Sequence, residues 1–170
     1  HLGMVEIANC RYIAFSGGKA YVSSYAGPVQ LNPNRDQIGY IAEIDTATFQ
    51  ITRTVTVGYQ PEELAVVNGK LYVANSGSYR YPNYDKTVSV IDLATFTEIK
   101  QIPVAINLHR LKADRHGRIY ISARGDYYSI PSNLYIIDTN TDTLQDSLNI
   151  PVSNFCIEGD SAYIYSTQWN

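Results

Sequence analysis

The sequence lacks the features of several protein classes. Lys and Arg number 13 against 16 Asp and Glu, no run of basic residues occurs, and the net charge is −3. This balance argues against nucleic acid as a partner. No apolar stretch of 18 residues occurs, so the sequence predicts no transmembrane helix. Charged residues make up 17% and hydrophobic residues 45%, which is typical of a folded domain rather than a disordered chain.

Motifs of common enzymes and metal sites are also missing. The sequence contains no Gly-x-Ser-x-Gly elbow, phosphate-binding glycine loop, His-Glu-x-x-His or Cys-x-x-Cys. We therefore predict no catalytic residue, no metal site and no cofactor. The two cysteines, Cys10 and Cys156, lie near the starts of equivalent runs, and Cys156 aligns with Ala65. We predict that both are buried free thiols rather than partners in a disulfide.

A repeated pattern is what the sequence does contain. The run Gly-Lys-Leu-Tyr-Val-Ala-Asn at 69–75 returns in altered form at 18–24, 117–123 and 160–166. A second run ends each time in an aspartate, and these aspartates are 47 and 46 residues apart: Asp45, Asp92 and Asp138. Repeats of about 40–50 residues made of short strands are typical of propeller blades. We therefore predict an all-β fold, a β-propeller of four-stranded antiparallel blades of which about three and a half are present.

We predict that residues 1–170 form a single β-propeller domain or a fragment of one. The predicted blades cover residues 9–57, 58–104, 105–150 and, in part, 151–170. Residues 3–7 are predicted to be the last strand of a preceding unit, which gives 15 strands. Because the sequence starts and stops within a repeat, we expect either a piece of a longer ring or two copies that complete a ring together.

Tyrosine is the one abundant aromatic residue, with 15 Tyr against 4 Phe and 1 Trp. A tyrosine ring packs against apolar groups while its hydroxyl bonds to water or to a ligand. Four tyrosines share one position of the repeat and are predicted to lie in the core: Tyr21, Tyr72, Tyr120 and Tyr163. Many of the others fall in loops.

The connections between predicted strands are of two kinds. Turns such as Asn68-Gly69, and those that begin with Asp45 or Asp92, are short and alike. The loops between the second and third strands are long and differ from one another. In an antiparallel meander these loops lie at the end opposite the short turns, where a rigid scaffold presents them as a binding face. The residues predicted to bind ligand there are Tyr25, Tyr59, Asn75, Tyr79, Arg80, Tyr81, Tyr84, Asn107, His109, Arg124, Asp126, Tyr127 and Tyr128.

Parts of the sequence resemble two groups of known proteins. The phrase Gly-x-x-Pro…Asn-Gly-Lys-Leu-Tyr-Val-Ala-Asn…Thr-Val-Ser-Val-Ile-Asp, from Gly58 to Asp92, resembles the YncE-like seven-bladed propellers. The loops at 75–85, 107–111 and 124–128 look like those of Bacteroidales surface lipoproteins that capture cobalamin beside an outer-membrane transporter.

This resemblance implies a non-catalytic protein that binds a small molecule, with a corrinoid as the ligand and an outer-membrane transporter as a partner. It also implies a location at the extracellular surface or in the periplasm. The sequence does not include the signal peptide and lipidated cysteine of that group, so the chain itself does not support an expectation of membrane anchoring.

Two alternatives remain open at this point. The first is an enzyme similar to the lactonase-type propellers, with a divalent cation in the central channel. Its candidate ligands, at the mouths of the inner strands, are Glu62, Glu63, Asn107 and Asn154. The second is a platform for another protein, because Tyr and Arg are enriched in protein interfaces. A concave cleft on the tyrosine-rich face favours a small ligand, whereas a flat aromatic face favours a protein.

Overall fold

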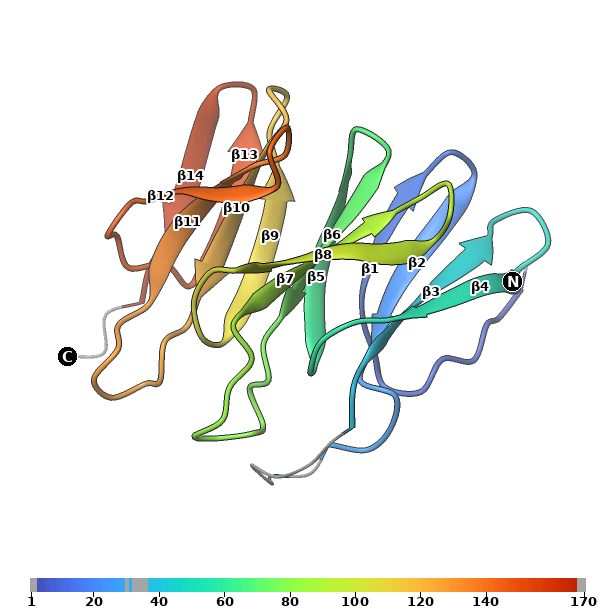
Figure 1. The fold of residues 1–170 in the computed structure, drawn as a ribbon, viewed down its shortest axis with the longest axis horizontal. Helices are drawn as coiled ribbons and strands as arrows, with labels where there is room; N and C mark the ends of the chain where they lie inside the picture. Colours follow the sequence, from blue (N-terminus) through green and yellow to red (C-terminus); the bar gives the residue numbers. More distant parts are fainter. Residues whose placement is uncertain (1–2, 30, 32–36, 168–170) are drawn as a thin grey trace.

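Four antiparallel sheets follow one another in the computed structural model, which describes residues 3–29, 31 and 37–167. Three sheets have four strands and the last has two. Within each sheet, strands that are neighbours in sequence are also paired in space, so each sheet is a simple meander. Figure 1 shows the sheets standing side by side in chain order, from blue to red. We call each sheet a blade and number the blades 1 to 4 from the N-terminus.

Every regular element of the described residues is a strand. Blades 1 and 2 comprise β1 (Cys10–Ser16), β2 (Lys19–Ser24), β3 (Tyr40–Asp45), β4 (Gln50–Thr56), β5 (Pro61–Val67), β6 (Lys70–Asn75), β7 (Thr87–Asp92) and β8 (Thr97–Pro103). Blades 3 and 4 comprise β9 (Leu108–Ala113), β10 (Arg118–Ala123), β11 (Asn133–Asp138), β12 (Thr143–Ser147), β13 (Asn154–Glu158) and β14 (Ser161–Tyr165). Between residues 3 and 167, the described chain forms no helix long and apolar enough to span a lipid bilayer.

The turns form as their sequences predict. Asn68 and Gly69, between β5 and β6, have φ angles of 50° and 76°, which suit a tight hairpin. The Asp45 carboxylate accepts hydrogen bonds from the backbone nitrogens of Ala47 and Thr48, both at 3.0 Å. In Figure 1 the turn between β5 and β6 lies at the top and the turn after Asp45 lies at the right, whereas the loops at 76–86 and 124–132 lie at the bottom.

The core consists of the apolar layers between blades. Leu71 and Val73 of β6 face blade 1, while Tyr72 and Ala74 of the same strand face blade 3, and all four side chains are fully buried. Successive residues of a strand point to opposite faces, so a blade with neighbours on both sides buries almost every residue of its central strand. The four-stranded blades thus confirm the predicted fold class.

Two tyrosines at the same position of the repeat link blade 1 to blade 2 and blade 2 to blade 3. The Tyr21 ring of blade 1 stacks on Phe96 of blade 2, with ring centres 6.1 Å apart. Tyr72 of blade 2 donates a 2.5 Å hydrogen bond to Asp142 of blade 3, and Lys70 lies 2.8 Å from both oxygens of that carboxylate. Burial and the Asp142 charge both raise the pKa of Tyr72, so its hydroxyl stays protonated and donates.

The predicted strand at residues 3–7 is wrong, and the described residues contain 14 strands. Val5 and Ile7 of this segment instead pack on the outer face of blade 1, against Ala20, Val22 and Ile44. The segment has an apolar contact there, but it forms no strand pairing with any other part of the described chain.

The prediction that Cys10 and Cys156 are buried is also wrong, because both free thiols are exposed. Tyr163 is 61% exposed and Tyr120 is half-buried, although both were predicted to lie in the core with Tyr21 and Tyr72. The cause lies in their positions. Cys10 faces outward from blade 1, Cys156 and Tyr163 lie on blade 4, and no further blade covers these faces.

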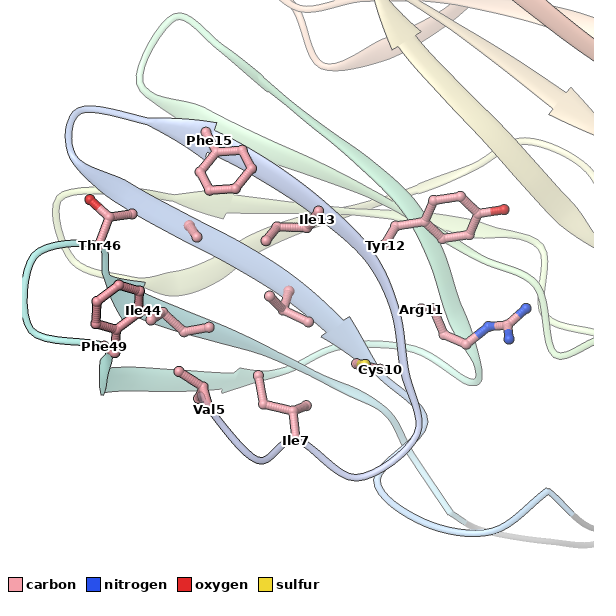
Figure 2. A pocket seen from close by; sticks show the side chains of 12 residues that line it. Val5, Ile7, Cys10, Arg11, Tyr12, Ile13, Phe15, Ile44, Thr46 and Phe49 are labelled. Carbon is pink, nitrogen blue, oxygen red and sulfur yellow. The ribbon is translucent and has the colours of Figure 1, made fainter. Parts of the chain in front are cut away.

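The uncovered face of blade 1 is hollowed and apolar. Figure 2 shows this hollow, of about 630 Å³, with Ile13, Phe15 and Phe49 among its lining residues. Ile13 occupies the position of Leu64 and Leu111 in the next two blades, and both of these leucines are buried by a neighbouring blade. The exposed face of blade 1 is therefore an unfinished core layer.

We expect Asp142→Ala to lower the free energy of unfolding by about 2 kcal/mol, because it removes the carboxylate that accepts from the buried Tyr72 hydroxyl and pairs with Lys70. Only the Thr139 carbonyl oxygen then remains as an acceptor for these two groups. Urea unfolding monitored by circular dichroism measures the change. Asp146→Ala is the control, since Asp146 is exposed and bonds only its neighbour Ser147. Equal losses in the two variants would contradict the role assigned to Asp142.

We expect the 170-residue chain to self-associate at micromolar concentration through the apolar face of blade 1. The double variant Ile13→Ser/Phe15→Ser should shift the light-scattering mass toward that of a monomer. Ile99→Ser removes an equally exposed isoleucine from the outer strand β8 and should leave the mass unchanged. A similar effect of both changes would show that this face does not drive association.

Candidate functional site

The inner strands of blades 1 to 3 lie next to one another and carry a repeated irregularity. The register of β1 shifts between Cys10 and Ile13, and that of β5 shifts between Pro61 and Leu64. The pairing of β9 with β10 shifts in the corresponding place. Such bulges redirect side chains, and each one here contains two consecutive polar residues at the loop end of its strand. These residues are Arg11, Tyr12, Glu62, Glu63, His109 and Arg110.

Glu62 is almost fully buried between blades 1 and 2. It accepts a hydrogen bond from the Tyr25 hydroxyl and lies 3.5 Å from Arg11, whose guanidinium also sits 4.9 Å from the centre of the Tyr25 ring. Burial and the Glu62 charge raise the pKa of Tyr25 well above its ordinary value. Tyr25, predicted to face a ligand, therefore holds a buried carboxylate and is itself buried.

Glu63 points into the next interface. Its carboxylate accepts hydrogen bonds from the Leu111 backbone nitrogen at 2.8 Å and from Lys112 at 2.5 Å. Both candidate carboxylates of the metal-dependent alternative are thus engaged by different cations. Within residues 3–29, 31 and 37–167, no three His, Cys, Asp or Glu side chains gather so that they could hold a metal ion. The geometry gives that alternative no support.

His109 reaches across to blade 1. Its Nε2 lies 3.0 Å from the Tyr12 hydroxyl and 2.7 Å from Arg124 Nη2, and Arg110 donates to the same tyrosine hydroxyl at 2.7 Å. Burial, followed by the charges of Arg124, Arg110 and Arg11, lowers the pKa of His109 to about 3. The imidazole is therefore neutral at physiological pH. As an arginine can only donate, Nε2 is the acceptor and Nδ1 carries the proton.

A side-chain amide fixes each long loop to the corner before the inner strand of its blade. Asn9 donates to Gly27 O at 2.9 Å, Gln60 accepts from the Tyr79 nitrogen at 2.8 Å, and Asn107 donates to Gly125 O at 3.0 Å. All three residues have φ angles near 50–60°, the left-handed region. The structure thus makes Asn107 an anchor of the loop beside it.

Other predicted residues also hold the loops. Asn75 is fully buried and donates to Thr87 and Ser89. The Asp126 carboxylate accepts hydrogen bonds from three backbone nitrogens and one hydroxyl of residues 128–130. These bonds lower the pKa of Asp126 to about 2.

Seven of the other predicted residues line two hollows on the loop face, whereas Tyr79 and Tyr81 line neither. The larger, of about 670 Å³, lies between blades 3 and 4, and we call it the His109 hollow. Its lining includes His109, Arg124, Tyr127 and Tyr128 of the predicted set. The smaller hollow, of about 330 Å³, lies beside blade 2 and is lined in part by Tyr59, Arg80 and Tyr84.

Aromatic contacts join the loops around these hollows. The Tyr81 ring lies 5.9 Å from Tyr84 in its own loop and 6.2 Å from Tyr128 in the loop of blade 3. Tyr79 packs edge-on against Tyr25, with centres 6.3 Å apart, and the Arg80 guanidinium lies 3.6 Å from the centre of the Tyr59 ring. The loops at 79–84 and 124–128 therefore touch, and the hollows lie on either side of that contact.

Sequence reasoning missed Arg11, Tyr12 and Arg110, which complete the polar cluster. Their signal was present in the repeat. Arg11, Glu62 and His109 occupy equivalent positions, so charged or polar residues recur at one place in the inner strands. Figure 2 shows Arg11 and Tyr12 pointing away from the apolar residues of the same blade.

Comparison with known proteins gives similar folds only. No protein-family model matches the sequence, and no curated protein matches it. The hydrazine synthase of Kuenenia stuttgartiensis is similar with a TM-score of 0.65 and 24% identity, over 84% of this chain and 36% of that chain. The β-propeller domain of the Trilobed protease from Pyrococcus furiosus is similar with a TM-score of 0.63 and 13% identity, over 92% of this chain and 48% of that chain. The WD40 β-propeller domain of Doa1 is similar with a TM-score of 0.55 and 14% identity, over 86% of this chain and 42% of that chain.

The fold is that of a β-propeller. The chain spans between about a third and a half of the length of these solved structures. Identities this low show the fold alone. Propellers carry many functions, and a hydrazine synthase and a WD40 domain are both among these similar structures, so the fold does not decide between catalysis and binding.

We expect His109 to remain neutral from pH 7 down to pH 4.5 in the folded chain, with ring NMR signals that do not titrate. The unfolded chain takes up this proton near pH 6.5, so it binds more protons than the folded chain below that pH. The free energy of unfolding should therefore decrease as the pH is lowered. The contribution of His109 to this decrease between pH 7 and pH 4.5 is up to about 2–3 kcal/mol.

Urea unfolding of the natural chain and of His109→Gln at pH 7 and pH 4.5 measures this contribution. The pH dependence should be weaker in the variant, because glutamine has no proton to gain. Ring signals of His109 that titrate near pH 6 would contradict the buried neutral state.

Proposed function

We propose that this propeller is a non-catalytic protein that binds a large, partly flat, polar ligand on its loop face. The observation that carries the proposal is the His109 hollow, which combines aromatic walls with polar groups. Tyr127 and Tyr128 are largely exposed beside it, whereas Tyr25 and Tyr72 are buried. Concave sites with aromatic walls and a few directed polar groups suit small molecules.

A corrinoid is the specific ligand that we propose. Corrinoids combine a flat macrocycle with an edge of polar amide groups, so tyrosine rings and hydrogen-bonding side chains suit both parts. The resemblance of residues 75–85, 107–111 and 124–128 to the loops of cobalamin-capturing surface propellers supports this choice. These segments contribute His109, Arg124 and Tyr128 to the hollow and Tyr81 to its rim.

The wider assignments rest on the same resemblance. We propose that the chain is a YncE-like propeller at the cell surface or in the periplasm, where it works beside an outer-membrane transporter. Further blades of the same kind, or a second copy, would cover the apolar face of blade 1 and complete the ring. The exposed Ile13 and Phe15 support this completion.

A protein partner is the second candidate function. Tyr81 and Tyr128 touch each other at the loop tips, and the latter is 84% exposed. Exposed aromatic pairs of this kind are frequent anchors of protein interfaces. On this alternative the two rings bind a protein surface and the hollow beside them stays solvated.

Calorimetric titration with cyanocobalamin, together with light scattering on the same sample, tests the corrinoid proposal. Saturable heat with one site per chain or per closed ring supports it. The absence of heat from a folded chain whose ring is complete would overturn it and favour the protein partner.

We expect Tyr128→Ala and Tyr81→Ala each to weaken cyanocobalamin binding by about 1–2 kcal/mol, which is roughly 5–30-fold. Thermal unfolding should change little, because both rings are exposed. Tyr163→Ala is the matched control, since this exposed tyrosine lies on blade 4 away from the loop face. If the loop variants instead unfold at much lower temperature, the two rings belong to the core.

A further inference from the structure

The cations around the inner ends of blades 1 to 3 outnumber the carboxylates. Four cations against two carboxylates leave an excess of two positive charges, in a chain whose net charge is −3. The two carboxylates, Glu62 and Glu63, pair with Arg11 and Lys112 respectively. The two remaining cations are Arg110 and Arg124.

Neither remaining arginine has a carboxylate partner in the described part of the chain. Arg110 donates to the Tyr12 hydroxyl, and its buried Nε has no hydrogen-bond partner. Asp126 lies two residues from Arg124, but its carboxylate is taken up by the backbone of its own loop. Among the described residues, Arg124 and Asp126 therefore form no ion pair, although they share one loop.

Arg124 is held in place by a neutral group. His109 Nε2 accepts its 2.7 Å hydrogen bond, and the ring keeps its proton on Nδ1. That Nδ1 is buried and has no hydrogen-bond partner, and the His109 side chain is only 8% exposed. A neutral ring orients the guanidinium but does not cancel its charge, so the remaining N–H groups of Arg124 stay able to bind an anion.

Arg124 lies in the wall of a cavity whose other lining residues are aromatic, apolar or neutral polar. Arg124 and His109 line the His109 hollow together with the rings of Tyr127 and Tyr128 and the hydroxyls of Ser132, Ser153 and Thr167. No Asp or Glu is among the residues that line it. Guanidinium groups bind carboxylate and phosphate oxygens through paired hydrogen bonds, more strongly where solvent access is reduced.

We propose that the His109 hollow is an anion-binding subsite, in which Arg124 binds a carboxylate or phosphate group carried by a ligand whose flat part lies against Tyr127 or Tyr128. His109 is a positioning residue that fixes the guanidinium. This inference rests on the proposed binding function of the loop face and adds the charge of the group that it selects.

Three small probes of similar shape test the subsite: phenyl phosphate, benzoate and neutral benzyl alcohol. NMR titration of the full chain at low ionic strength measures each dissociation constant. We expect saturable shifts at Arg124 and Tyr128 for the anions, and at least tenfold weaker binding of benzyl alcohol. The tighter of the two anions identifies phosphate or carboxylate as the preferred group. Equal binding of benzyl alcohol would overturn the proposal.

Variants separate the roles of the two residues. Arg124→Gln should weaken anion binding about tenfold or more. The anion affinity of Arg124→Lys should lie between those of Arg124→Gln and the natural chain, because lysine keeps the positive charge but lacks the paired N–H donors of the guanidinium. Arg115→Gln is the control, since Arg115 pairs with Asp160 at the short-turn end. Binding unchanged in Arg124→Gln would overturn the proposal.

His109→Gln can still accept a hydrogen bond from Arg124, so it should retain most of the anion affinity that His109→Leu loses. Equal loss in both variants would overturn the positioning role. Raising the salt concentration gives a readout that needs no variant. Anion affinity should fall with salt while benzyl alcohol binding does not, and equal salt dependence would overturn the charge-based site.

The same samples distinguish this proposal from the corrinoid proposal. Cyanocobalamin binding that is unaffected by Arg124→Gln would overturn the anion subsite and leave the corrinoid proposal intact. Anion binding that depends on Arg124, in a complete ring that does not bind cyanocobalamin, would support the subsite and direct the search to other anionic ligands.

Discussion

Face-to-face packing of apolar sheet surfaces is the constraint on which this structure depends. A central strand such as β6 buries Leu71 against one neighbouring blade and Tyr72 against the other. Each blade therefore needs a neighbour on both sides, which explains why Phe15 and Tyr163, on the outer faces of blades 1 and 4, are exposed although their strands follow the repeat. The Tyr72–Asp142 and Tyr21–Phe96 contacts fix how neighbouring blades are oriented.

This scaffold leaves one end of the blades free to differ. Side-chain amides of Asn9, Gln60 and Asn107 tie the start of each inner strand to the loop of its own blade. The anchors make long loops rigid enough to present tyrosines in fixed places, and the bulges beside them direct polar residues toward one another. Rigid loops lose less entropy when they bind, which suits a binding site more than a flexible surface does.

Most of the fold could be predicted from the repeat, but only part of the site could. Tyr127, Tyr128, Arg124 and His109 line one hollow as predicted residues of the loop face, since chain connectivity alone puts those loops at one end. The roles of Asn107 and Asp126 could not be predicted. A polar residue in a loop has the same sequence pattern whether it forms hydrogen bonds with a ligand or with the neighbouring backbone. Their hydrogen bonds become visible only when the loop has a definite shape.

The sequence by itself determined the strands, the turns and the blade repeat, because these follow from local alternation, turn chemistry and spacing along the chain. Only the tertiary structure decided which repeated residues are buried, since Tyr72 and Tyr163 share a position but differ in whether a neighbouring blade covers them. The tertiary structure also decided which charged groups form ion pairs. Glu62 and Glu63 each pair with a cation, whereas Arg124 donates a hydrogen bond to the neutral His109. Such pairing depends on distances between side chains of different strands, and no local pattern encodes those distances.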